Sequence, residues 1–193
     1  MTETEKALAG ELYDANFDPT LIAARLRTKQ ALKVYNDTDP ADLEGRDAQL
    51  RALLGRAGQR LLIEQPFHCD YGTNIEVGDN FYANFNLVIL DANKVVIGDN
   101  VFIAPNVGLH TSGHPLDARR RNAGLEYAKP ITIGHNVWIG AGVNVMPGVS
   151  IGDNSVIGAG SVVTRDVPAH VVAAGVPCRV MKSIAGLNGE EEC

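Results

Sequence analysis

A hydrophobic repeat with a period of six residues constrains the fold of this chain more than any other feature. Toward the C-terminus its members are Ile133, Ile139, Val145, Ile151, Ile157 and Val163. A helix face recurs about every 3.6 residues and a strand face every two, so neither explains a sustained period of six. A parallel β-solenoid with three short sides per coil does explain it, because one aliphatic residue then enters the core from each side.

The same repeat is present upstream, with two interruptions. Its upstream members are Val77, Ala83, Ile89, Ile97, Ile103 and Leu109. The spacing of eight between the third and fourth members predicts that two extra residues bulge out around positions 92–94. The repeat then stops after Leu109 and returns in register at Ile133. Each coil of a solenoid needs only its neighbours, so we expect a loop excursion over about 110–131, and long loops are often functional.

Residues 1–60 show helical spacing instead of the six-residue repeat. Asp18-Pro19 is a typical helix start, and the apolar residues that follow predict a helix over 19–34. A second helix is predicted from Pro40 to about Leu54. Helices this short need a partner, and the open start of the solenoid offers one. The chain therefore divides into a helical cap (1–60), a solenoid (61–185) and a frayed tail (186–193).

Composition excludes several classes of function. The formal net charge is -6 and no long basic run is present, which argues against a nucleic-acid partner. No apolar run approaches the ~18 residues that span a bilayer, and the N-terminus lacks a secretory pattern. The three cysteines, Cys69, Cys178 and Cys193, are odd in number and suit reduced thiols, although a pairing of the first two stays open. We expect a cytoplasmic protein without a membrane partner.

Several motifs point to one family. They are Phe81-Tyr82-Ala83-Asn84-Phe85-Asn86, Ile97-Gly98-Asp99-Asn100, Gly113-His114-Pro115, Ile133-Gly134-His135-Asn136-Val137-Trp138-Ile139-Gly140 and Ala173-Ala174-Gly175-Val176-Pro177-Cys178-Arg179-Val180. With them, the chain resembles the hexapeptide-repeat acyltransferases, and in particular the maltose and galactoside O-acetyltransferases. The resemblance implies an all-β, left-handed parallel β-helix, although parallel crossovers are generally right-handed. It also implies a homotrimer that binds acetyl-CoA between neighbouring subunits.

The resemblance assigns the catalytic roles to two side chains. It makes His114 the general base, and histidine titrates close enough to neutral pH for that role. It gives Asn84 the task of holding the acceptor or stabilising the charge of the tetrahedral intermediate. It also places an oxyanion-binding amide near Ala141. Without the resemblance, a loop histidine is more often merely solvated, and a corner asparagine more often satisfies its own turn.

The binding residues are also carried over from the family. The candidate residues for binding the acceptor are Asp14, Arg25, Asp70, Asp91 and Asn84. The candidate residues for binding acetyl-CoA are Ala141, Ala159, Thr164, Arg165, Arg179 and Lys182. Asp70 replaces a serine common in the galactoside enzymes, and those enzymes often carry two acids where this chain has Asp91 alone. The stretch around residues 68–72 looks more like the maltose type, and the identity of the sugar stays open.

The expected function is acetyl-CoA-dependent O-acetylation of maltose, glucose or a related sugar, by direct attack and without a metal. Galactoside, serine and xenobiotic acetyltransferases are alternatives. A γ-carbonic-anhydrase-like zinc enzyme is another, because His110, His114 and His135 supply three imidazoles, although their spacing is not that family's. A non-catalytic solenoid that binds partners is the last alternative.

Overall fold

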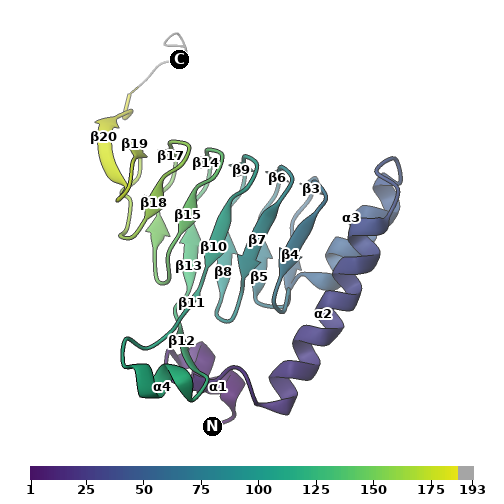
Figure 1. Ribbon diagram of the computed structural model, residues 1–193. Helices are drawn as coiled ribbons and strands as arrows, with labels where there is room; N and C mark the ends of the chain where they lie inside the picture. Colours follow the sequence, from purple (N-terminus) through teal and green to yellow (C-terminus); the bar gives the residue numbers. More distant parts are fainter. Residues whose placement is uncertain (187–193) are drawn as a thin grey trace.

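The computed structural model describes residues 1–186, so the predicted tail (186–193) lies almost wholly outside it. The chain forms a parallel β-helix with helices at its N-terminal end (Figure 1). One side of the coil contains β2 (Arg56–Ala57), β5 (Ile75–Val77), β8 (Val95–Ile97), β13 (Ile131–Ile133) and β16 (Ser150–Ile151). The second contains β3 (Leu61–Ile63), β6 (Phe81–Ala83), β9 (Phe102–Ile103), β14 (Trp138–Ile139), β17 (Val156–Ile157), β19 (Val171–Ala174) and β20 (Arg179–Ser183). The third contains β4 (Phe67–Cys69), β7 (Leu87–Leu90), β10 (Gly108–His110), β15 (Asn144–Val145) and β18 (Val162–Val163).

The core confirms the six-residue repeat. Every predicted member, upstream and downstream, is at most 2% exposed. The side chains stack in rows along the axis, as where Ile97 pairs with Val77 on one side and Ile133 on the other. Ser155 and Ser161 are buried in the same interior, and their hydroxyls donate to backbone carbonyls, which removes the cost of burying them.

The corners of the coil are formed by asparagines in the left-handed region. Asn80, Asn100, Asn136 and Asn154 have φ between 55° and 57°. Their side chains also form a ladder, in which each amide donates to the oxygen of the next at 2.9 to 3.1 Å. These are the Asn positions of the repeated Gly-Asp-Asn and Gly-His-Asn turns, which sequence places at corners because Asn tolerates positive φ.

The predicted bulge lies in the expected place but points the other way. Equivalent positions in successive coils are 20 residues apart upstream and 18 residues apart downstream. The two extra residues of the coil that contains β7 and β8 lie in the corner between these two strands. Ala92 and Asn93 are buried instead of solvent-exposed. The amide of Asn93 donates to the carbonyl oxygens of Ala7 at 2.9 Å and Ala128 at 3.2 Å. The corner turns inward because the N-terminal segment covers it.

Four helices are present in the described chain: α1 (Glu3–Ala9), α2 (Pro19–Asp37), α3 (Leu43–Leu53) and α4 (Ala118–Asn122). The predicted start of α2 is confirmed, because Asp18 caps it and Pro19 follows. α3 begins three residues later than predicted, because Asp42 accepts from the Gly45 amide and takes the capping role. None of the helices described is long and apolar enough to cross a membrane.

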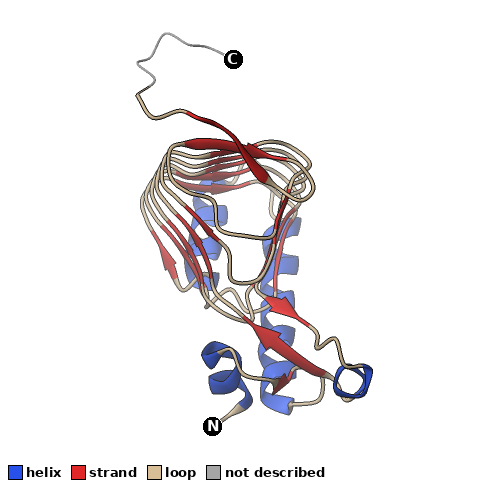
Figure 2. Cartoon of the chain, turned by 90° about the vertical axis from the view of Figure 1, so that its left-hand side faces the viewer, coloured by secondary structure: helices blue, strands red, loops and turns tan. Residues whose placement is uncertain are grey.

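The cap docks in two places, of which the sequence indicates only one. As predicted, α2 and α3 cover the first coil, where Asn36 donates to the Phe67 carbonyl at 2.9 Å. The segment before them pairs with the excursion. There β1 (Tyr13–Asp14) lies antiparallel to β12 (Leu125–Ala128), which pairs with β11 (Ser112–Gly113). This small sheet projects from one corner of the coil (Figure 2).

The stacked rows should dominate stability. Replacing Ile97 by alanine removes a fully buried side chain from a rigid wall, and we expect the free energy of unfolding to fall by about 2–5 kcal/mol. Val96, its neighbour on β8, points outward, and Val96→Ala should cost less than about 1 kcal/mol. Urea unfolding of both variants measures the difference. Equal losses would contradict the inward and outward assignment.

Candidate active site

A cavity of about 440 Å³ lies where the excursion, the cap and the third side of the coil meet. Its lining comprises Tyr13, Ala15, Asn16, Arg25, Asp70, Tyr71, Leu90, Ala92, His110, Ser112, Gly113, His114, Glu126 and Met146. Three candidates chosen from the sequence, His114, Asp70 and Arg25, therefore share one cavity. Because segments far apart in the sequence converge on it with several polar and titratable groups, this cavity is the candidate active site.

His114 follows β11 and stands half-exposed at the cavity. Its Nδ1 lies 3.4 Å from the carbonyl oxygen of Leu125, which can only accept a hydrogen bond. That contact favours the tautomer with hydrogen on Nδ1 and a lone pair on Nε2. Nε2 in turn lies 3.7 Å from Oε1 of Glu126. The ring is thus oriented to take a proton at Nε2 beside a carboxylate.

Glu126 is a site residue that the sequence analysis missed. It lies on β12, and its Oε2 accepts a hydrogen bond from the Tyr13 hydroxyl at 3.0 Å. The six-residue repeat carries no signal for it, because β12 belongs to the excursion. Only the antiparallel register with β1 brings Glu126 into the cavity wall. A search for acids soon after His114 could have nominated it, together with others.

Arg25 and Asp70 form the polar wall opposite the excursion. The Arg25 guanidinium donates to the Tyr71 hydroxyl at 2.8 Å and to the Ala15 carbonyl at 2.7 Å. Burial raises the pKa of the Asp70 carboxyl, and the positive charge of Arg25 partly offsets that rise. An anchored guanidinium and a carboxylate are suited to hydrogen bonds with a polyol.

Asp91 does not line the cavity. Its side chain is fully buried, and Oδ1 accepts from the amides of Asp70 at 3.0 Å and Tyr71 at 2.9 Å. Oδ2 has no hydrogen-bond partner within residues 1–186, and burial raises the pKa of this carboxyl to about 6. Asp91 therefore supports the turn that carries Asp70, and its neighbour Ala92 faces the cavity instead.

The Asp14 carboxylate is likewise engaged with the backbone. Its Oδ1 accepts from the backbone amides of Asn16 at 3.2 Å and Phe17 at 2.9 Å, so it closes a turn. It is not among the residues that line the cavity. Both carboxylates bond to backbone amides, which are local ones for Asp14 and those of the neighbouring coil for Asp91. The sequence does not show whether a carboxylate near a turn is used in this way or faces a ligand.

The candidates for acetyl-CoA lie along another part of the solenoid. Ala141 and Ala159 follow β14 and β17 at one corner, at which the acceptor candidate Asn84 also lies, after β6. The Ala141 carbonyl accepts from the Gly160 amide at 2.8 Å. The Ala141 amide donates no hydrogen bond within the described chain and is free for a ligand. The exposed candidates beyond them are Thr164 and Arg165 after β18, and Arg179 and Lys182 on β20. Within one chain, Asn84 is not among the residues that line the cavity of His114.

The three histidines of the zinc alternative do not converge. His110 lies in the cavity with Nε2 3.0 Å from Oδ1 of Asn144. His135 stands at a coil corner, where its Nδ1 lies 3.0 Å from the Asp99 amide. Over the part of the chain that is described, no three His, Cys, Asp or Glu side chains are grouped to hold a metal ion. Within one chain the three imidazoles therefore do not form a common site.

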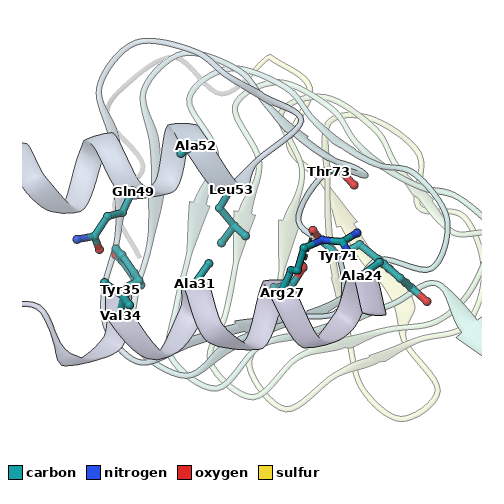
Figure 3. Close-up of a pocket in the computed structure, with 11 residues that line it drawn as sticks. Ala24, Arg27, Ala31, Val34, Tyr35, Gln49, Ala52, Leu53, Tyr71 and Thr73 are labelled. Atoms are coloured by element: carbon teal, nitrogen blue, oxygen red, sulfur yellow. Dashed lines mark hydrogen bonds between the residues drawn. The ribbon is translucent and has the colours of Figure 1, made fainter. Parts of the chain in front are cut away.

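A second cavity, of about 430 Å³, lies between α2, α3 and the first coil (Figure 3). Ala31, Leu53 and Tyr35 face it from the two helices, and its lining is mostly apolar. It contains no histidine or carboxylate, so it lacks a general base for acyl transfer. The cavity of His114 therefore remains the candidate active site.

Two family models match the chain. The maltose acetyltransferase hexapeptide capping motif matches residues 6–58, and the bacterial transferase hexapeptide (six repeats) matches residues 130–165. The galactoside O-acetyltransferase of Escherichia coli strain K12 is 50% identical over 184 residues, which cover 95% of this chain and 90% of that protein.

Two solved structures agree with these matches. A maltose O-acetyltransferase from Clostridium difficile 630 superposes with a TM-score of 0.93 and 52% identity, over 95% of this chain and 98% of that one. A galactoside acetyltransferase in complex with coenzyme A gives a TM-score of 0.92 and 49% identity, over 95% and 92%. The left-handed parallel β-helix expected from the sequence is confirmed as the fold class.

The buried carboxyl of Asp91 should make stability depend on pH. Its pKa is about 6 in the folded chain against 3.8 for the free group, so folding favours the protonated form. This stabilising contribution is complete below about pH 4 and is lost as the pH rises through about 6. Relative to wild type, Asp91→Asn should therefore become more stable between pH 4 and 7.5, by up to about 3 kcal/mol. Urea unfolding at both pH values measures this, and a constant difference would contradict it.

Proposed function

The chain belongs to the maltose and galactoside O-acetyltransferase family of hexapeptide-repeat proteins, and on that basis we propose that it acetylates a hydroxyl of maltose, glucose or a related sugar. It is an acetyl-CoA-dependent O-acetyltransferase. The observation that carries the proposed acceptor and base is the single cavity in which His114, Glu126, Asp70 and Arg25 meet.

His114 acts as the general base in this proposal. Nε2 takes the proton of the acceptor hydroxyl as its oxygen attacks the thioester carbonyl carbon of acetyl-CoA. The resulting oxyanion is stabilised by a backbone amide such as that of Ala141, with Asn84 holding the acceptor. Collapse breaks the carbon–sulfur bond, and the imidazolium returns its proton to the departing thiolate. Glu126, 3.7 Å from Nε2, stabilises the positive ring in between.

The polar wall of the cavity supports a sugar as the acceptor. Asp70 can accept from sugar hydroxyls, and the guanidinium of Arg25, fixed by Tyr71 and Ala15, can donate to them. Galactosides are the second candidate acceptor, since a galactoside acetyltransferase is 50% identical to this chain. A cytoplasmic location is part of the proposal, because the buried thiols Cys69 and Cys178 are unpaired.

We further propose a homotrimer with active sites between neighbouring subunits. Asn84 and Ala141 lie outside the cavity of His114 in their own chain, so a partner subunit would supply them. The pantetheine arm of acetyl-CoA would lie along Ala141, Ala159, Thr164 and Arg165, with the thioester toward His114. Arg179 and Lys182 would lie toward the nucleotide end and hold the phosphates.

Removing the base tests the mechanism. We expect His114→Ala to lower kcat by about 10²–10⁴ with maltose or glucose, because proton removal then depends on water. The measurement is release of the CoA thiol from acetyl-CoA, over a panel that includes galactosides, serine and chloramphenicol. His170→Asn removes an imidazole at a distant corner, keeps a residue that tolerates φ of 58°, and should retain activity. Near-normal activity of His114→Ala would refute the assignment of His114 as the general base. Faster release of the CoA thiol with a non-sugar acceptor than with any sugar would refute a sugar as the acceptor.

Subunit mixing tests the shared site. His114→Ala and Asn84→Ala homotrimers should each be nearly inactive, whereas trimers refolded from an equal mixture should regain intact sites. If each site takes His114 from one subunit and Asn84 from the next, about a quarter of the sites in random trimers are complete. Activity that never exceeds the sum of the two separate variants would show that one chain supplies both groups. Analytical ultracentrifugation confirms the oligomeric state of each sample.

A further inference from the structure

One buried hydroxyl links the cap to the catalytic excursion. Tyr13 is 2% exposed, and its hydroxyl donates to Oε2 of Glu126 at 3.0 Å. The two residues are 113 positions apart in the sequence and directly opposite in the register of β1 and β12. Backbone pairing and side-chain contact therefore hold the same two residues against each other.

The Tyr13 hydroxyl determines which oxygen of Glu126 is free. Oε2 accepts from the phenol, and Oε1 is left 3.7 Å from Nε2 of His114. Burial raises the pKa of Tyr13, and the charge of Glu126 adds to that rise. The phenol therefore keeps its proton and remains a donor at physiological pH.

No second group in the described chain holds the Glu126 side chain. Its one hydrogen bond within residues 1–186 comes from Tyr13. The other charged side chains of the cavity form no hydrogen bond with Glu126 within the described chain, although the charge of Glu126 adds to the rise that burial causes in the pKa of Asp70. Arg25 donates to Tyr71 and Ala15, and Asp70 lies on the turn supported by Asp91. Loss of the phenol hydroxyl would therefore leave the carboxylate free to rotate.

We propose that Tyr13 is a positioning residue for acetyl transfer, which holds Glu126 so that its free oxygen faces the His114 imidazole. The inference rests on the proposed function, in which His114 becomes positively charged as it takes the acceptor proton. A carboxylate fixed beside that ring stabilises the charge more than a mobile one, because no reorganisation is needed during the reaction. The cap thereby contributes to catalysis as well as to covering the coil.

Tyr13→Phe tests the role with little change in packing, because only the hydroxyl is removed. We expect kcat to fall about tenfold while the KM for acetyl-CoA stays unchanged, because coupling between contacting groups is commonly of this size. Tyr35→Phe is the matched control, since Tyr35 is 1% exposed and donates to the Ile63 carbonyl, away from the cavity. It should lower the melting temperature by a similar amount and leave kcat within about twofold.

A double-mutant cycle separates a role through Glu126 from a general effect on folding. Glu126→Ala should lower kcat, and adding Tyr13→Phe to it should lower kcat no further. Full activity of Tyr13→Phe, or an equal loss in both backgrounds, would overturn the inference. If His114→Ala were fully active, the proposed function would fail first. If His114→Ala were inactive and the cycle additive, only the role of Tyr13 would fail.

Discussion

The stacking of successive coils in register is the constraint on which the rest of this structure depends. Ile97 lies between Val77 and Ile133 in one row of the core, and the backbone ladder fixes the rise from coil to coil at about 4.8 Å. Such a wall needs only its nearest neighbours, so it can be interrupted at a corner. The chain leaves after β10 and re-enters with Ile131 paired to Val95. The repeat thus supplies a rigid frame, and under the proposed function the irregular segment carries the chemistry.

The excursion is not self-supporting, and this explains the second docking site of the cap. β11 and β12 make a two-stranded unit, which is marginally stable in water. β1 adds a third strand, and the buried amide of Asn93 joins the carbonyls of Ala7 and Ala128 across the same region. The N-terminal segment therefore holds His114 in place as much as it covers the coil.

The sequence predicted those features of the fold that are periodic or local. The core rows, the asparagine corners and the Asp18 cap of α2 each have a signal within a few residues. The roles of Tyr13 and Glu126 have none, because they depend on an antiparallel register between segments 113 residues apart. The inward turn at Ala92 was missed for the same reason, since it depends on the N-terminal segment that covers that corner. The use of the Asp91 carboxylate was missed because its partners are amides of the neighbouring coil. The proposed pairing of Asn84 with His114 joins two subunits, so it stays a prediction.

The distribution of charge gives acetyl-CoA a preferred direction under the proposed function. The cavity holds the carboxyl groups of Asp70 and Glu126, whereas Arg179 and Lys182 stand exposed on β20, at the far end of the coil. Nucleotide phosphates would be attracted to the second region. The thioester and the pantetheine arm are uncharged, so this end of the molecule can approach the cavity without an electrostatic cost. Charge would thus orient the donor before any specific contact forms, and the neutral sugar would meet it at the boundary where His114 stands.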